Sequence, residues 1–436
     1  MKSLLKDKSV LVGLGLFTYF FLLLLGVMIP IFRLGTSGGL STAFIYRAII
    51  FTLFFIVVIL MFYKKYHSVN YILAIFLAIF GVSNILAIFI PFGDIQVSYQ
   101  LKWMSVLYMV SVIFTVFAFY EVLAAYIDNK SLITFFILLV ATALVCALYS
   151  NIKEFDAIIK AFTASGEDAH FYQIHSFFDN KNSYGLVLFV AMLANIFLLI
   201  RLKNKWLIVP LVYLALNVII SRSKTALIAL VLLGLLAGIY YFIKSFPHHK
   251  KRNIIIVSSL GVLVALFLII VFVPSIYQSN TFFTHLSNYV REAFIGQAIR
   301  SLQDRFNNLA LAKDIFLTPR ILLGYGEHTC YSYANTCCYR LGYIDNAYIY
   351  NLLAGGIFKT ALFIYCYYLI FKTLVKVYKS NVAPIFKVLS WGVVISILLY
   401  GLMENYQVLG SNHTSFIFLI YSYSIPTFLL KEVNNE

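Results

Sequence analysis

Long apolar runs separated by short polar breaks cover most of this chain. A helix that crosses a bilayer needs about 20 consecutive apolar residues, and runs of this kind recur from near the first residue almost to the last. We predict twelve membrane-spanning helices, at residues 9–32, 41–63, 71–92, 103–127, 132–150, 184–200, 206–220, 226–243, 254–275, 346–371, 388–405 and 415–430. The pattern therefore predicts an all-α, polytopic integral membrane protein, with residues 1–436 forming a single membrane domain.

Composition excludes two other classes of protein. Of the 436 residues, 62% are hydrophobic and 11% are charged, whereas soluble domains average about 25% charged residues. The mean hydropathy of +0.91 agrees with a membrane protein. The net charge of +16 is distributed among the apolar runs, as expected for loops that flank membrane helices, so it gives no indication of nucleic-acid binding.

The distribution of basic residues predicts the topology. Three lysines precede the first run, which lacks a small-residue cleavage site, so we expect a retained span rather than a cleaved signal. With both termini in the cytosol, the inner loops contain 18 of the 33 basic residues but only four of the 17 acidic ones. Such an excess is typical of cytosolic loops. We therefore expect a multi-pass protein of the plasma (inner) membrane, with long extracytoplasmic loops at residues 151–183 and 276–345.

The second of these loops has the pattern of an amphipathic helix at residues 289–316. Arg291 and Arg305 fall within its apolar arc, whereas Arg300 falls on the polar arc. An arginine held at an apolar surface forms strong paired hydrogen bonds with phosphate. Alternatively, both side chains reach the lipid headgroups without a specific ligand.

A second basic site is the short external turn at residues 221–225. It contains two cations, Arg222 and Lys224, and three hydroxyl groups at the start of a predicted helix. Helix N-termini attract anions, so the turn is a candidate phosphate site. The alternative is a polar turn in which Ser223 or Thr225 caps the helix.

Charged residues within the predicted spans are also candidates, because such residues commonly serve function. Arg47 lies near the outer end of the second span and is a third candidate cation for pyrophosphate. Lys359 lies deeper, where we expect it to pair with Glu121 or with a backbone carbonyl.

Two junctions between a loop and a span carry further polar residues. Asp345 stands at the mouth of a span and is a candidate general base for a hydroxyl nucleophile. Together with Asn346 it also forms an ordinary helix cap. His175 and Asn182 precede the sixth span and have the same two interpretations, of which capping is favoured.

The five cysteines divide into two groups. Cys146 and Cys366 fall within spans, where we expect them to pack. In the second loop, Cys330 is predicted either to form a disulfide with Cys337 or Cys338 or to remain a free thiol.

The order of these motifs resembles that of the bacterial O-antigen polymerase and ligase family. The matching elements lie between about residues 178 and 358: the run at 221–227, the long loop, Arg305 with the Gly-Tyr-Gly sequence at 324–326, and Asp345-Asn346 with the glycines at 355–356. The N-terminal third matches in hydropathy alone.

The resemblance implies a glycosyltransferase that joins undecaprenyl-diphosphate-linked oligosaccharides on the outer side of the membrane, without cofactor, metal or nucleotide sugar. It implies that Arg222 and Arg305 bind the pyrophosphate. Ligases carry a histidine where Asp345 stands, so a repeat-unit polymerase for O-antigen, capsule or exopolysaccharide is favoured. A flippase and a chain-length regulator of the same pathway are candidate partners.

Two alternatives remain at this point. A ligase differs from a polymerase only in the acceptor of the glycan. A flippase for lipid-linked oligosaccharide would also need many spans, but such carriers usually contain internal repeats, and the two halves of this chain differ in loop length.

Overall fold

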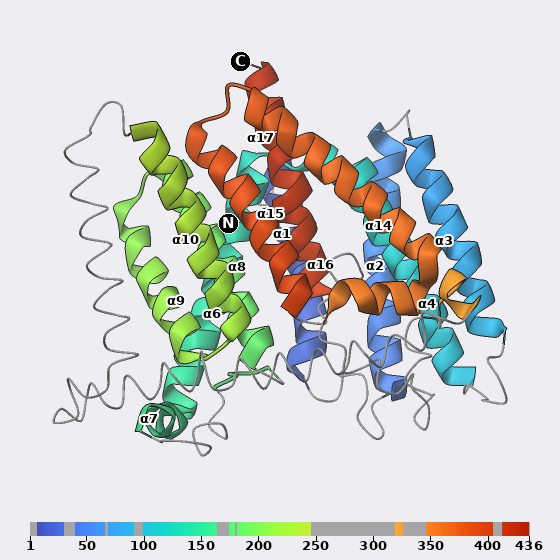
Figure 1. The fold of residues 1–436 in the computed structure, drawn as a ribbon, viewed down its shortest axis with the longest axis horizontal. Helices are drawn as coiled ribbons and strands as arrows, with labels where there is room; N and C mark the ends of the chain where they lie inside the picture. The colour runs from blue at the N-terminus through green and yellow to red at the C-terminus, as the bar shows by residue number, and fades with distance from the viewer. Residues whose placement is uncertain are drawn as a thin grey trace. The chain divides into compact units, whose positions relative to one another are not determined.

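The computed structural model describes residues 7–29, 40–65, 69–90, 99–163, 174–178, 181–245, 319–324, 326, 346–403 and 412–435. These residues are almost entirely helical, and no strand occurs among them. In a bilayer every backbone polar group needs an internal partner, which the α-helix provides within one segment. An all-α polytopic membrane protein is thus the observed fold class (Figure 1).

The elements follow the apolar runs closely. They are α1 (Lys8–Met28), α2 (Leu40–Lys65), α3 (Tyr71–Phe89), α4 (Tyr99–Phe117), η3 (Ala118–Leu123), α5 (Ala124–Tyr126), α6 (Asn129–Lys153), α7 (Phe155–Thr163), α8 (Lys181–Leu202), η5 (Lys205–Leu207), α9 (Ile208–Ile220), α10 (Lys224–Ser245), η8 (Pro319–Leu322), α14 (Ala347–Lys379), α15 (Pro384–Met403), α16 (His413–Leu419), η11 (Ile420–Ser424) and α17 (Ile425–Asn435).

Polar residues begin several of these helices. Asp7 accepts a hydrogen bond from the Ser9 backbone N–H at the start of α1. Asn70 and Asn412 cap α3 and α16 in the same way. These caps satisfy backbone N–H groups that have no partner within the helix.

Among the described residues, nine helices are long and apolar enough to cross a membrane, and two shorter apolar helices lie at Lys205–Ile220 and Thr225–Leu236. Eleven of the twelve predicted spans coincide with one of these helices. The remaining one, at residues 254–275, lies outside the described residues, so the full count stays a prediction. The predicted loop at residues 151–183 is partly helical, because α6 extends to Lys153 and α7 follows it.

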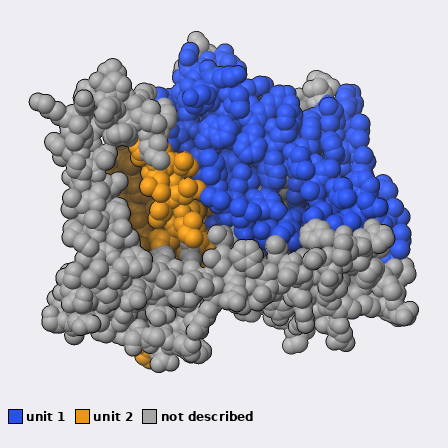
Figure 2. Space-filling model, in the orientation of Figure 1, with its two compact units in different colours: residues 1–138, 305–436 blue, residues 139–304 orange. Residues whose placement is uncertain are grey.

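The chain forms two compact units (Figure 2). Unit 1 comprises residues 1–138 and 305–436, and unit 2 comprises residues 139–304. The division leaves the prediction of a single membrane domain untested.

Aromatic side chains form the core of unit 1. Phe416 of α16 lies at its centre, with its ring centroid 5.1 Å from that of Phe119 and 6.1 Å from those of Phe20 and Phe135. These rings come from α16, η3, α1 and α6, and all four are fully buried. The cluster fixes the last span of the chain against the first.

Both ends of unit 1 contact the junction between α5 and α6. Asp7 forms a 2.9 Å salt bridge with Lys130, and Lys431 of α17 donates a hydrogen bond to the Ala124 carbonyl. The hydrogen bond from Lys130 holds the pKa of Asp7 below its ordinary value. Asp7 and Lys431 therefore lie at the same end of this unit, as the predicted topology requires, although the side of the membrane stays a prediction.

A glycine contact breaks helix α14. Gly356 has φ +67° and ψ −168°, a non-helical conformation that side chains rarely permit. There α14 meets the segment after η8, where Gly324 also has a positive φ and the Gly326 N–H donates a 2.8 Å hydrogen bond to the Ala354 carbonyl. Figure 1 shows the first turns of α14 running across the direction of its long second part.

Candidate anion-binding site

The turn between α9 and α10 holds a buried arginine in a strained conformation. Arg222 has φ +56°, in the left-handed region, and it is 9% exposed. Its neighbours Ser221 and Ser223 are also buried. A left-handed non-glycine residue costs free energy and persists only where its surroundings determine it, so the turn is a fixed feature of unit 2.

Hydrogen bonds of the two serines fix this turn. The Ser221 hydroxyl donates to the Val218 carbonyl at 2.8 Å. The Ser223 hydroxyl accepts from the Ala226 N–H at 3.4 Å, which caps α10 and confirms the capping interpretation for Ser223. The same hydroxyl donates to the Asn182 side-chain oxygen at 3.2 Å. The first turn of α8 and the turn at Arg222 therefore form one site.

A close approach of α8 to the Ser223 side chain accompanies this contact. A Cβ atom on Gly185 of α8 would lie 2.4 Å from the Ser223 Cβ, closer than side chains can pack. Glycine at this position permits α8 to contact the turn directly. Lys224 begins α10, and its side chain lies outside what the structure describes.

His175 is held by a glutamate that the sequence did not suggest. Glu154, at the end of α6, accepts hydrogen bonds from the Ser150 hydroxyl at 2.7 Å and the Ser176 N–H at 3.0 Å. The His175 ring lies 3.7 Å from the same carboxylate. His175 therefore contacts an acidic partner rather than capping α8, and the contact ties residues 174–178 to α6.

Asn346 is the N-cap of α14. Its side-chain oxygen accepts hydrogen bonds from the N–H groups of Tyr348 and Ile349, each at 3.1 Å. Its amide nitrogen donates to the Leu402 carbonyl of α15 at 3.3 Å. The capping interpretation is confirmed for Asn346, while Asp345 lies outside the described residues and its role as a base stays a prediction.

Two other charged residues lie in unit 1. Arg47, on α2, lines a pocket of this unit. Lys359, on α14, is fully buried, and its ammonium nitrogen lies 5.3 Å from the centre of the Phe363 ring. Glu121 accepts a hydrogen bond from the Asn70 N–H, and the expected pairing of Lys359 with Glu121 or with a backbone carbonyl stays a prediction.

Several predicted features lie outside the described residues. They are Arg291 and Arg305 with the amphipathic helix at 289–316, Asp345, and the cysteines at 330, 337 and 338. Cys146 and Cys366 are buried free thiols, as expected. Among the residues that the structure describes, no cluster of three His, Cys, Asp or Glu side chains is placed to hold a metal ion.

Sequence reasoning missed His413, which is 5% exposed and lines the same pocket as Arg47. The signal was present, because the polar run Ser411 to Ser415 directly precedes an apolar stretch.

Comparison of the chain with known protein families, with curated proteins and with solved structures gives no match.

Proposed function

We propose that this membrane protein is a glycosyltransferase of the plasma membrane that polymerises undecaprenyl-diphosphate-linked oligosaccharide repeat units into a surface polysaccharide. The reaction takes place on the outer side, where nucleotide sugars are not supplied. The donor must therefore arrive already activated on its lipid. The product is an O-antigen, a capsule or an exopolysaccharide, and a flippase delivers the substrate.

The observation that carries this proposal is the buried Arg222 in its left-handed turn. A guanidinium group presents a rigid set of donors that matches two phosphate oxygens. In a site with little water, such hydrogen bonds are stronger than at an exposed surface. Ser221, Ser223 and Asn182 add hydroxyl and amide groups at the same place.

Glycosyl transfer from a lipid diphosphate gives a buried arginine such as Arg222 a role. The bond between the donor sugar and its phosphate breaks, and the electron pair leaves with the lipid diphosphate. The acceptor hydroxyl forms the new glycosidic bond and gives up its proton, for which Asp345 is the candidate base. A preorganised arginine stabilises the negative charge that develops on the leaving diphosphate.

A second feature supports the resemblance to the polymerase and ligase family. The Gly-Tyr-Gly sequence at 324–326 and the glycine pair at 355–356 are two of its elements, and they contact each other across the break in α14. This contact explains why glycine is needed at both places in the motif. The aspartate at position 345 favours a polymerase over a ligase within the family.

A comparison of two left-handed cations in unit 2 tests the role of Arg222. Lys203 has φ +52° and is exposed, whereas Arg222 has φ +56° and is buried. Glycine relieves backbone strain at either position, and the amount of each variant in the membrane is measured beside its polymer, because Arg222→Gly also removes a buried side chain. We expect Arg222→Gly to abolish polymer formation in a complemented deletion strain and Lys203→Gly to retain it.

Normal polymer from Arg222→Gly at wild-type abundance would show that the arginine only shapes the turn. The same deletion strain distinguishes the alternatives. Single repeat units on the final acceptor indicate a missing polymerase, whereas lipid-linked units trapped in the cytosol indicate a missing flippase. Polymer that remains on its lipid carrier indicates a missing ligase.

A further inference from the structure

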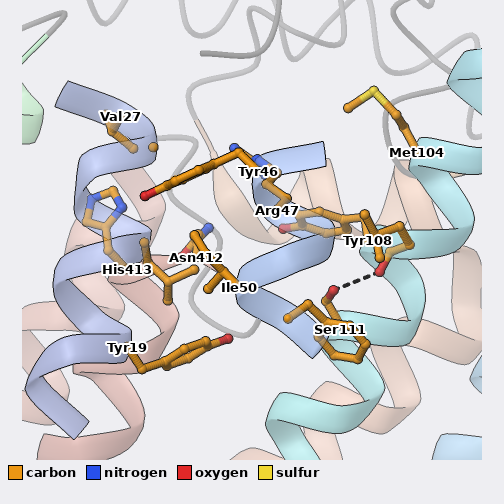
Figure 3. A pocket seen from close by; sticks show the side chains of 14 residues that line it. Tyr19, Val27, Tyr46, Arg47, Ile50, Met104, Tyr108, Ser111, Asn412 and His413 are labelled. Atoms are coloured by element: carbon orange, nitrogen blue, oxygen red, sulfur yellow. Dashed lines mark hydrogen bonds between the residues drawn. The ribbon is translucent and has the colours of Figure 1, made fainter. Parts of the chain in front are cut away.

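An open pocket lies within unit 1 among α1, α2, α4 and the start of α16 (Figure 3). Its lining is divided equally between residues with and without a polar side-chain atom. The walls include Leu23, Val27, Ile50 and Met104, and the polar groups include Arg47 and His413. Pockets of this composition are typical of sites for small amphipathic ligands.

The charge of the pocket favours an anion. None of its fourteen lining residues is acidic, and Arg47 contributes a permanent positive charge. Seven of the fourteen lining residues carry no side-chain oxygen or nitrogen, so a bound anion would meet less competition from water than at an open surface. An anion carried by an apolar chain fits such a lining better than a free ion does.

His413 provides the second, independent indication of a ligand. Its side chain is 95% buried, and its ring lines the pocket. The Nδ1 atom has no hydrogen-bond partner among the described residues, and only the Thr414 hydroxyl, at 3.5 Å, contacts Nε2. A buried polar atom without a partner is costly in a folded protein, and a ligand in the pocket would satisfy it.

The pocket lies at the end of unit 1 that is opposite to Asp7. Asp7 and Val27 are twenty residues apart on α1, which corresponds to about 30 Å along the helix axis. This distance is the thickness of the hydrocarbon core. In the predicted topology the pocket therefore lies at the level of the outer headgroups.

We propose that this pocket binds the phosphate group of a lipid, with Arg47 and His413 as its ligands and the apolar walls in contact with the chain. The phosphate oxygens accept hydrogen bonds from the Arg47 guanidinium and from the His413 ring. Two sources share this chemistry, namely an isoprenyl diphosphate and a bilayer phospholipid.

The test is calorimetric titration of the full-length protein in a nonionic detergent, in an Arg222→Gly background. This background removes the diphosphate site of the proposed function, so that failure of one proposal is distinguishable from failure of the other. The probes are geranyl diphosphate, inorganic pyrophosphate and geraniol. We expect geranyl diphosphate to bind at least tenfold more tightly than either of the others, because only it offers both the anion and the chain.

Two variants and one control locate the binding. Arg47→Gln should weaken the binding of geranyl diphosphate at least tenfold, since hydrogen bonds between charged groups contribute most to the affinity. His413→Phe keeps an apolar ring and should weaken it by about two- to tenfold through loss of one hydrogen bond. Lys102→Gln is the matched control and should leave the affinity for geranyl diphosphate unchanged. Lys102 is a cation near Met104 at the start of α4, but it does not line the pocket.

Wild-type affinity in both Arg47→Gln and His413→Phe would overturn the proposal, as would equal binding of pyrophosphate and geranyl diphosphate. If dihexanoyl phosphatidylglycerol competes with geranyl diphosphate for the pocket, the proposal holds and the occupant is a bilayer phospholipid. If this phospholipid does not compete, the proposal holds and the occupant is an isoprenyl diphosphate.

Discussion

The contact between Gly324 and Gly356 provides a sharp test of the fold around α14. A Cβ atom on Gly356 would lie 2.4 Å from the Leu322 carbonyl oxygen and 2.6 Å from the Gly324 nitrogen. Both neighbours are backbone atoms, which cannot rotate away. Gly356→Ala therefore forces either the two segments apart or α14 into a new path.

The cost follows from two terms. A side chain at φ +67° and ψ −168° adds about 1–3 kcal/mol of backbone strain. Overpacking against fixed atoms adds typically about 1–3 kcal/mol. We expect Gly356→Ala to lower the free energy of unfolding by about 2–6 kcal/mol. Gly15 on α1 is the control, because a Cβ atom there would meet nothing within 4 Å and alanine favours the helix by up to about 1 kcal/mol.

The assay is unfolding in mixed detergent and sodium dodecyl sulfate micelles, followed by circular dichroism in the aromatic region. Gly324→Ala should behave like Gly356→Ala, since its Cβ would lie 2.5 Å from the Gly356 nitrogen. The double variant should lose less free energy of unfolding than the two single variants lose together, because either substitution alone already breaks the shared contact. Additive effects, or a Gly356→Ala protein within about 0.5 kcal/mol of the wild type, would refute the glycine contact.

The remaining predictions concern the reaction and the topology. If Asp345 is the general base, Asp345→Asn should reduce turnover by about 10²- to 10⁴-fold without weakening the binding of the lipid-linked donor, and retention of a third of the activity would exclude that role. Arg305→Lys should reduce polymer output nearly as much as Arg305→Ala, because the planar fork is lost, while Arg300→Ala should be close to wild type; a fully active lysine variant would contradict paired phosphate binding. In a background without native external cysteines, a cysteine at exposed position Asp156 should react with a membrane-impermeant thiol reagent on intact cells and one at exposed position Lys205 should not; the reverse pattern would invert the topology.

Local features of this fold were readable from the sequence because short-range physics determines them. Apolar runs predicted the positions of the spans, and the cap at Asn346 follows from a polar residue before such a run. The short helix α7 was missed although its nine residues are strongly amphipathic, because so short a stretch does not stand out between two long apolar spans. The long helices were thus predicted from the apolar pattern, whereas the short helix α7 was not.

Contacts between distant segments were not readable in the same way. The glycines at 324 and 356 were both visible as motif elements, but nothing local indicates that their backbones meet. The pocket of Arg47 and His413 joins residues more than 350 positions apart, and the link of Asn182 to Ser223 joins two helix starts. Such juxtapositions depend on the packing of whole helices, which one sequence does not specify.

Reconstitution from purified components tests the proposed polymerase activity. The purified protein is incorporated into vesicles with lipid-linked repeat units isolated from the deletion strain, without nucleotide sugar. We expect a ladder of glycans that grows by whole repeat units, with one undecaprenyl diphosphate released for each new bond. Vesicles that contain correctly folded protein and flipped substrate but yield neither a ladder nor released lipid diphosphate would contradict it.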